Sequence, residues 1–374
     1  MIFLLILAGG ILAQLLAEKY YEKNWRKRLK AEIRFQRKPV FQGEEGILTE
    51  IIENDKNLFL PALQAGFAVS RNLSFGQEEN TSVSDQSYKR DIYSVMGRQR
   101  ITRQVHFLAV RRGYYEIKKV DLVTRGILLA GEMYHTIPCS TYLYVYPKKI
   151  SGENWEQLFW QISGVHESRK RLLEDPFQFR GIREYTVEDP INKINWKASA
   201  RTGNLMVNQH NSAVSGNIYI LLDVEDETVW KYEEIHEEGI RLAAAAAESF
   251  LSRGIEVGLI TNGKDCKEKG EIFLPGQSGR GQAAKFFQCL ARIDLGAQSR
   301  KFSDCMEEKR ELLLAKESFC ILITKNQYRE LAEVMAELGE KNRGSVYLAT
   351  LYPEMELKIK RRQDMEVLRW EVKR

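Results

Sequence analysis

The residues with the most capacity for chemistry lie in a thirty-residue stretch that begins at Gly181. It brings cationic, carboxylate, hydroxyl and aromatic side chains close together, at Gly181, Arg183, Tyr185, Asp189, Trp196, Lys197, Ser199 and Arg201. Arg183, Lys197 and Arg201 could clamp an anion or a carboxylate, because a guanidinium offers a planar fork of donors. In a purely structural alternative, Asp189 pairs with Arg183 or Arg201, and Trp196 fills a junction between domains. A surface that binds a partner is a further alternative.

Catalysis is the last interpretation of the same cluster. A hydrolase would use Ser199 as its nucleophile, activated by Lys197. Two side chains that are two residues apart on a helix do not face each other, which argues against this pair. From Gly181 onward, no His or Cys occurs before His210 to act as a base or nucleophile. We therefore predict no catalytic residue in this stretch.

A second charged segment runs from Asp223 to Glu238 and contains eight acidic residues against one Lys. Such a run is most often the solvated face of a helix. The alternative is an acidic docking patch at Glu233, Glu234, Glu237 and Glu238, which would speed the association of a basic partner in a salt-dependent way. We interpret His236, within this segment, as a surface residue.

The elements that must position these residues follow from hydrophobic patterning. After Pro147, strands are predicted at 217–223, 255–261, 319–324 and 345–350, and helices at 155–171, 233–253, 282–293, 303–316 and 327–341. Strands that alternate with helices indicate right-handed crossovers and a doubly wound parallel sheet with both faces covered. A hairpin through 264–274 and one or two closing strands within 357–373 complete this part.

From about Phe35 to Pro147, strand patterns dominate instead. Alternating apolar and polar residues, rich in β-branched and aromatic types, predict strands at 46–53, 101–110, 114–124 and 141–146. Clusters of Gly, Asn and Asp separate these runs, which favours an antiparallel β-sandwich of immunoglobulin-like type.

The sequence begins with an apolar run at residues 2–17 that contains a single strongly polar side chain. The run is shorter than the roughly twenty residues of a bilayer span, but Tyr20, Tyr21 and Trp25 follow where aromatic side chains settle among lipid headgroups. No Lys or Arg precedes the run, whereas residues 18–38 hold nine against three Glu. We therefore predict a single transmembrane anchor with a cytoplasmic body; a cleaved signal peptide or a soluble amphipathic helix are the alternatives.

Composition excludes several classes of function. Of the 374 residues, 44% are apolar and 10% aromatic, which argues against disordered and fibrous chains. The net charge of +5 comes from the basic stretch at 18–38, so the remainder lacks the phosphate-tracking face of a nucleic-acid binder. Five widely spaced Cys without C-x-x-C favour a reducing compartment, and no P-loop is present for ATP hydrolysis.

The stretch from Gly181 resembles the signature of the family called domain of unknown function 58, roughly G-x-R-x-Y-x-x-G-D-x-x-R-x-I-x-W-K-x-S-A-R-x-x-x-L-x-V. The run Arg111-Arg-Gly-Tyr-Tyr in the predicted sandwich resembles a second element of that family, R-R-G-x-Y. Two positions depart from the pattern: Glu188 stands where the family usually has Gly, and Asn192-Lys193 replaces a basic pair.

Many members of this family contain a von Willebrand factor type A domain, which the predicted α/β part resembles. The resemblance implies a divalent cation at the carboxyl ends of the strands, held by an Asp-x-Ser-x-Ser loop, a Thr and a second Asp. Here Asp223 is kept, Glu225 and Glu227 replace the two Ser, and Lys325 stands at the second Asp. We expect a degenerate, metal-free site in which the Lys325 ammonium replaces the cation, with divalent binding at Asp223 as the alternative and no other cofactor.

The resemblance also implies a class of partner, since such proteins are commonly encoded beside MoxR-type AAA+ ATPases and are thought to assist them. The leading hypothesis is a membrane-anchored, non-enzymatic scaffold or adaptor that binds another protein through its type A-like domain. The alternatives are an envelope-linked hydrolase that uses Arg183, Asp189, Lys197 and Ser199, and a sensor whose sandwich recognises a ligand. No nucleic-acid partner is expected.

The predicted organisation has five parts. They are a transmembrane anchor at 1–18, a basic juxtamembrane segment at 19–34, the β-sandwich at 35–150, a linking helix with the signature at 151–215, and the type A-like α/β domain at 216–374.

Overall fold

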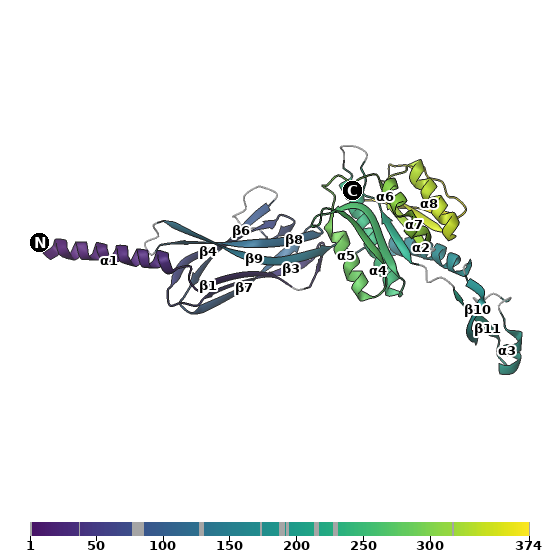
Figure 1. Cartoon of the computed structure of the whole chain (residues 1–374), viewed down its shortest axis with the longest axis horizontal. Helices are drawn as coiled ribbons and strands as arrows, with labels where there is room; N and C mark the ends of the chain where they lie inside the picture. The colour runs from purple at the N-terminus through teal and green to yellow at the C-terminus, as the bar shows by residue number, and fades with distance from the viewer. Residues whose placement is uncertain are drawn as a thin grey trace. The chain divides into compact units, whose positions relative to one another are not determined.

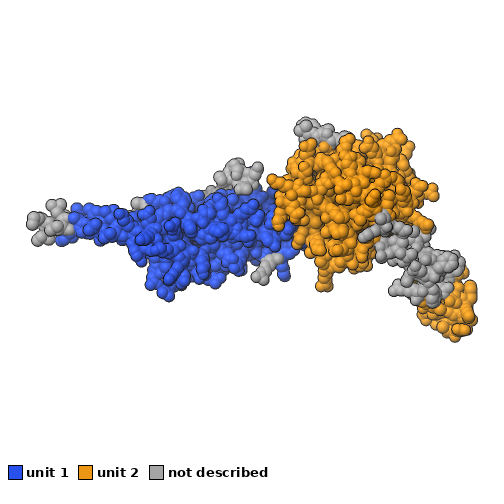
Figure 2. Space-filling view, in the orientation of Figure 1, with its two compact units in different colours: residues 1–148 blue, residues 149–374 orange. Residues whose placement is uncertain are grey.

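The computed structural model divides the chain into two compact units, residues 1–148 and 149–374, which Figure 2 shows in separate colours. It describes the backbone of residues 2–36, 38–76, 86–126, 131–172, 174–186, 191, 194–212, 217–226, 231–315 and 318–373. Within these ranges it describes all side chains except those of residues 2–5, 86, 170–172, 174–180, 208–212 and 315.

Unit 1 contains a two-sheet β-sandwich (Figure 1), as the strand patterns predict. One sheet has the strand order β1-β3-β7-β5, and the other has the order β2-β9-β8-β4-β6. The pairs are antiparallel except for β2 and β9. The strands are β1 (Leu29–Phe35), β2 (Val40–Phe41), β3 (Glu45–Asn54), β4 (Leu60–Ser70), β5 (Leu73–Ser74), β6 (Gln86–Val95), β7 (Gln99–Ala109), β8 (Gly113–Arg125) and β9 (Glu132–Tyr146).

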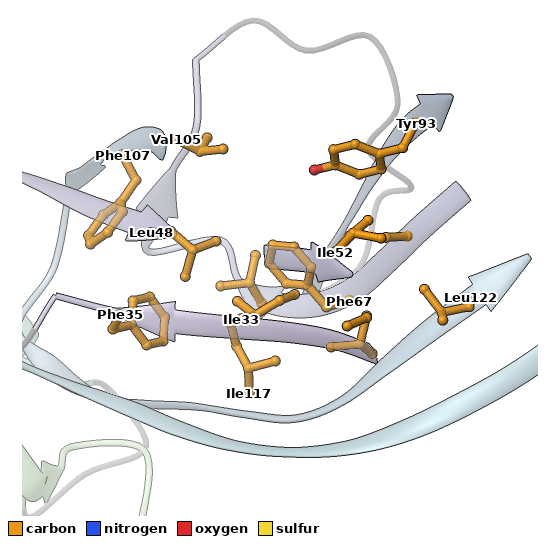
Figure 3. Close-up of a cluster of buried hydrophobic side chains, with 14 of the residues drawn as sticks. Ile33, Phe35, Leu48, Ile52, Phe67, Tyr93, Val105, Phe107, Ile117 and Leu122 are labelled. Carbon is orange, nitrogen blue, oxygen red and sulfur yellow. The ribbon is translucent and has the colours of Figure 1, made fainter. Parts of the chain in front are cut away.

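The sandwich core forms because apolar residues alternate with polar ones along the strands. Successive side chains of a strand point to opposite faces, so every second residue of β3 is buried, including Leu48 and Ile52. Figure 3 shows these two residues among other buried side chains from both sheets, including Phe67 of β4 and Ile117 of β8. The rings of Phe35 and Phe107 meet edge to face with centroids 5.8 Å apart.

The sandwich begins earlier than the sequence suggests. Strand β1 starts at Leu29, within the segment that we predicted to be a basic juxtamembrane stretch. Its residues alternate between buried apolar and more exposed positions, a period-two pattern that the charge count hides. Tyr21 and Trp25, which we expected among lipid headgroups, are 1% and 3% exposed and belong to the sandwich core.

Helix α1 (Ile2–Asn24) forms over the N-terminal apolar run. Its large apolar side chains from residue 6 to residue 16 are 53% to 68% exposed, namely Ile6, Leu7, Ile11, Leu12, Leu15 and Leu16. Over the part of the chain that the structure describes, no helix combines the length and the apolar character needed to cross a bilayer. The prediction of a helix is confirmed, and the prediction of a span is not.

Unit 2 is built on a mostly parallel sheet of strand order β14-β13-β12-β16-β17-β18. Strand β14 is antiparallel at one edge, and the short β15 also pairs with β13. The other pairs are parallel, as the alternation of strands and helices predicts. The strands are β12 (Ile218–Leu222), β13 (Val257–Asp265), β14 (Glu271–Gln277), β15 (Ile293–Asp294), β16 (Phe319–Thr324), β17 (Ser345–Leu351) and β18 (Met365–Glu371).

Helices cover both faces of this sheet, so β12, β16 and β17 are buried along their whole length. On one face, α4 lies close to the sheet: its central run of alanines is buried, and a Cβ atom at Gly239 would lie 3.5 Å from Ile323. On the other face, Leu331 and Met335 of α8 belong to the same buried cluster as Leu322 of β16. The helices are α2 (Glu153–Leu172), α4 (Glu233–Ser252), α5 (Arg280–Arg292), α6 (Phe302–Glu308), α7 (Arg310–Ala315) and α8 (Arg329–Asn342).

The signature stretch forms a strand, a short helix and a second strand. Strand β10 (Glu174–Glu184) pairs antiparallel with β11 (Met206–Ser212), and α3 (Trp196–Thr202) lies between them in the sequence. Asn195 caps α3 by accepting a hydrogen bond from the Ala198 N–H, and Gly203 ends it in the left-handed conformation with φ of 78°.

Candidate functional site

The carboxyl ends of β12 and β16 lie side by side at the centre of the sheet in unit 2. The chain runs from β12 outward to β13 and β14, and then returns to continue from β16 in the opposite direction. Such a reversal of strand order is where doubly wound sheets bind their ligands. Asp223 follows β12 and Lys325 follows β16, so the structure brings these two predicted site residues to the same edge.

Asp223 is 2% exposed, and hydrogen-bond donors surround its carboxylate. Oδ1 accepts from the Glu225 N–H at 2.8 Å and from Asn262 Nδ2 at 3.1 Å. Oδ2 accepts from Thr324 Oγ1 at 2.7 Å and from Asn326 Nδ2 at 2.8 Å. A buried carboxylate is stable only when such bonds replace its hydration, and here neutral donors do so on both oxygens.

The two asparagines are themselves held in place by the backbone. Asn262 Oδ1 accepts from the Val224 N–H at 2.9 Å, and its Nδ2 also donates to the Arg300 carbonyl at 3.0 Å. Asn326 Nδ2 also donates to the Glu225 carbonyl at 3.0 Å, and the Tyr347 hydroxyl donates to the Asn326 carbonyl. The network therefore ties the carboxyl ends of β12 and β16 to β13.

Lys325 does not point at Asp223, contrary to our expectation. Its Nζ lies 3.1 Å from Asp226 Oδ1 and 5.1 Å from the centre of the Tyr232 ring. Asp226 also contacts His236 Nε2 at 2.9 Å. Burial opposes the ionisation of Asp226, but the hydrogen bonds and charges of His236 and Lys325 outweigh it and lower the Asp226 pKa. His236 is 3% exposed, so its interpretation as a surface residue is wrong.

The residues present do not fit a divalent cation. Such an ion needs carboxylate oxygens that can turn toward it, whereas both oxygens of Asp223 are engaged by donors. Glu225 accepts from the Phe302 N–H at the start of α6, and burial raises its pKa. Among the described residues, no three His, Cys, Asp or Glu are placed to hold a metal ion. Glu227 lies outside the described residues.

The predicted acidic patch is partly occupied by contacts within unit 2. Glu234 Oε2 accepts from the Tyr352 hydroxyl at 3.1 Å, and Glu238 accepts from Trp370 Nε1 at 2.9 Å and from Arg241. Glu233 is exposed, and Glu237 is half-buried. The N-terminal turns of α4 therefore present a weaker acidic surface than the residue count suggests.

The signature residues make local bonds in the β10–α3–β11 segment. Ser199 Oγ donates to the Asn195 carbonyl at 2.8 Å and accepts from the Met206 N–H at 2.8 Å, which joins α3 to β11. Arg183 Nη1 donates to the Glu184 carbonyl at 2.9 Å. Trp196 is 66% exposed.

Other signature residues have simpler surroundings. The Tyr185 N–H donates to the Leu205 carbonyl at 2.8 Å. Lys197 and Arg201 are exposed, and Gly181 is half-buried in β10. The described residues do not include Glu188, Asp189 or Asn192-Lys193. The pairing of Asp189 with an arginine is therefore neither observed nor excluded.

Sequence reasoning missed the residues that complete the Asp223 network. Asn262, Thr324 and Asn326 are uncharged, and none of them stands at a position that the resemblance assigns to a metal ligand. Their positions carried a signal nonetheless, because each lies at or near the carboxyl end of a strand that borders Asp223. Side chains at those ends meet at one edge of a parallel sheet.

Comparisons with known proteins support the family resemblance for part of the chain. Residues 181–325 match the family described as Protein of unknown function DUF58. A search of curated proteins found no significant match. One similar solved structure is the CARDB domain of a Pyrococcus furiosus protein in complex with di-metal ions. The match spans 30% of this chain and 86% of that domain, with 12% sequence identity and a TM-score of 0.19. Another is PapD-like domain 7 of human CEP192, where the match spans 34% of this chain and 87% of that domain, with 17% sequence identity and a TM-score of 0.19. Likenesses this distant give no information about activity or partner.

Proposed function

We propose that this chain is a non-enzymatic adaptor that binds a partner protein at the carboxyl edge of the unit 2 sheet. The observation that carries the proposal is that hydrogen-bond donors engage both carboxylate oxygens of Asp223. At the position where a doubly wound sheet places its ligand chemistry, this chain has a carboxylate satisfied by four donors. A network without a free nucleophile, base or metal ligand suits a rigid surface better than a reaction centre.

The unit 2 architecture supports a type A-like assignment. The strand order places three strands on one side of the switch point and three on the other, with the antiparallel strand β14 at the outer edge. Asp223 after β12 and the polar loop after β16 occupy the places that the family resemblance assigns to a metal-dependent adhesion site. We propose that this is a degenerate von Willebrand factor type A-like domain in which asparagine and threonine donors replace the metal ion.

We further propose that α1 attaches the chain to a membrane, with the two units in the cytoplasm. The apolar side chains of α1 are exposed over residues 6–16, and contact with lipid would remove them from water. Several Lys and Arg follow the helix, and cations next to an apolar segment are attracted to anionic lipid. The partner class proposed from the family resemblance is a MoxR-type AAA+ ATPase, which would be recruited to the membrane.

A capture experiment with matched charge reversals tests the adaptor proposal. The full chain carrying Glu233→Lys, at the carboxyl edge of the sheet, is compared with wild type and with Glu340→Lys, which lies near the C-terminus of α8. Both glutamates are exposed, so neither reversal should unfold unit 2. We expect an AAA+ ATPase to be recovered from membranes with wild type and Glu340→Lys and to be depleted with Glu233→Lys. Equal recovery with all three proteins, or recovery of no ATPase, contradicts the proposal.

The hydrolase alternative is not favoured by the described contacts. The Ser199 hydroxyl donates to one backbone group and accepts from another, so it serves as a link between α3 and β11. Lys197 is exposed on α3, two residues away, where it does not face Ser199.

A further inference from the structure

Strand β18 is an open edge of the unit 2 sheet. It pairs with β17 on one side, and among the described residues no strand pairs with its other side. The Val372 N–H donates to the Leu351 carbonyl, and the Asp364 carbonyl accepts from the Ser345 N–H, so even-numbered residues bond to β17. Because the backbone groups of a strand alternate in direction, those of Val367, Arg369 and Glu371 point to the open side.

A cavity of about 470 Å³ adjoins the C-terminal half of β18 and is lined by Arg369, Trp370 and Glu371 of that strand. The amide side chains of Asn154, Gln157 and Gln161 of α2 line it as well. Amides both donate and accept hydrogen bonds, so they could satisfy an added backbone. Exposed strand edges are templates for pairing, and natural proteins block them unless pairing is useful.

The charges along β18 match those of a second β18 in one antiparallel register. We propose that two copies of this chain pair through β18 and join their sheets about a two-fold axis at Trp370. In this register, Arg369 lies opposite Glu371 of the second copy, and Glu371 lies opposite its Arg369. The outward backbone groups of both residues then meet as hydrogen-bonded pairs. A two-fold axis makes each contact occur twice.

The neighbouring registers are unfavourable. A shift that centres the pairing on Arg369 places two arginines opposite each other, and a shift to Glu371 places two glutamates opposite each other, which destabilises a strand pair. Within one copy, Arg369 Nη2 lies 3.1 Å from Glu371 Oε1, so the two side chains already share one face of the strand. Their side chains are 30% and 60% exposed. Arg369 Nη2 also donates to the Pro353 carbonyl at 3.1 Å, so in the pair Arg369 would exchange only its contact with Glu371 for one across the edge.

Charge reversal tests the pairing with its own internal control. The full chain is purified in mild detergent, and its mass is measured by light scattering and by sedimentation over a range of concentrations. We expect wild type to dimerise, and we expect Glu371→Arg and Arg369→Glu each to raise the dimer dissociation constant about tenfold or more, because each variant opposes like charges at two places. The double variant Arg369→Glu with Glu371→Arg restores opposite charges and should restore dimers.

The same series contains the results that would overturn the proposal. A wild-type chain that stays monomeric at every concentration would overturn the proposal. It would do so even if the β18 edge were then found to pair with another protein. Dimers that all three variants form as strongly as wild type would also overturn it, since association through α1 would behave in this way. Failure of the double variant to recover would exclude this register. Circular dichroism confirms that each variant is folded.

Discussion

Asp223 carries a buried carboxylate whose two oxygens are both engaged by neutral donors. Two asparagines, a threonine and a backbone N–H donate to it. Replacing Asp223 with Ala would leave these buried donors without an acceptor, so we expect the free energy of unfolding of unit 2 to fall by about 2 to 4 kcal/mol. Asp223→Asn, which keeps one oxygen, should cost less. Chemical denaturation of the full chain measures both.

The same residue gives a metal prediction. Because the Asp223 oxygens are engaged, millimolar Mg²⁺ or Mn²⁺ should leave the unfolding midpoint of unit 2 unchanged in wild type and in Asp223→Ala. A ligand that binds only the folded state raises its stability by mass action. A midpoint that rises with the metal in wild type and not in the variant would show that the site binds a cation after all.

Glu50 provides a pH prediction in unit 1. This carboxyl group is 4% exposed, and the Tyr93 hydroxyl donates to it. The pKa of Glu50 is raised to about 7, chiefly by burial and also by the Asp91 carboxylate, while Tyr93 and Lys89 oppose the rise. Asp91 is in turn paired with Lys89 at 3.2 Å and with Arg103 at 2.7 Å.

The sign of the pH effect follows from the raised pKa. The folded chain keeps the Glu50 proton between the usual value of 4.5 and about 7, whereas the unfolded chain releases it. Stability from this group is therefore complete below 4.5 and is lost as the pH rises through 7, by at most about 3 kcal/mol. Glu50→Gln should flatten this dependence in thermal unfolding, and Glu53→Gln, on the same strand, should not. A wild-type unit 1 that gains stability from pH 5 to 8 would contradict this.

At the scale of elements, the Ser199 hydroxyl is one of the links between α3 and β11. Ser199→Ala removes both of its bonds, so the Met206 amide should exchange its hydrogen at least several-fold faster, because a bond of about 1 kcal/mol is lost. Lys197→Ala, on the exposed side of the same helix, serves as the control. Hydrogen exchange read by mass spectrometry or NMR checks the prediction. Unchanged exchange at Met206 in Ser199→Ala would mean that the hydroxyl is available for another role.

A continuous apolar run could be predicted from the sequence, whereas a strand whose apolar residues alternate with charged ones was missed. Strand β16 is buried on both faces and consists only of apolar residues, Cys and a terminal Thr, so the prediction of 319–324 matches its bounds. Strand β1 was missed because its charged residues, read as a run, resemble a membrane-flanking segment. The helix predicted at 303–316 is divided into α6 and α7 at Lys309. The sequence has no Gly or Pro at this point that would predict the break.

The candidate site was predictable in position but not in its interactions. The residue after β12 is fixed by the strand pattern, so Asp223 could be placed at the switch point. Which side chain after β16 turns toward it depends on the backbone path beyond the strand. Asn326 reaches Asp223, while Lys325, one residue earlier, points to Asp226. Sequence spacing alone cannot distinguish these two orientations.

At the scale of the whole molecule, α1 gives a prediction about lipid. The double variant Ile11→Asn with Leu15→Asn places two polar amides on an exposed apolar helix. We expect it to reduce the binding of the full chain to anionic lipid vesicles at least tenfold in a flotation assay, because each apolar side chain withdrawn from water contributes about 1.5 to 3 kcal/mol. Ile92→Asn removes a comparably exposed apolar residue from the sandwich and should leave binding unchanged. Equal flotation of all three proteins would contradict membrane attachment through α1.

The most direct test of the adaptor account maps which face of unit 2 touches a partner in native membranes. A photo-reactive amino acid is placed at Glu233, beside the carboxyl ends of the strands, or at Lys285, which is exposed on α5. The account predicts a cross-link from position 233 to an AAA+ ATPase and none from position 285. Cross-linking of that ATPase from both positions equally, or only from position 285, would contradict a partner surface at the carboxyl edge of the sheet.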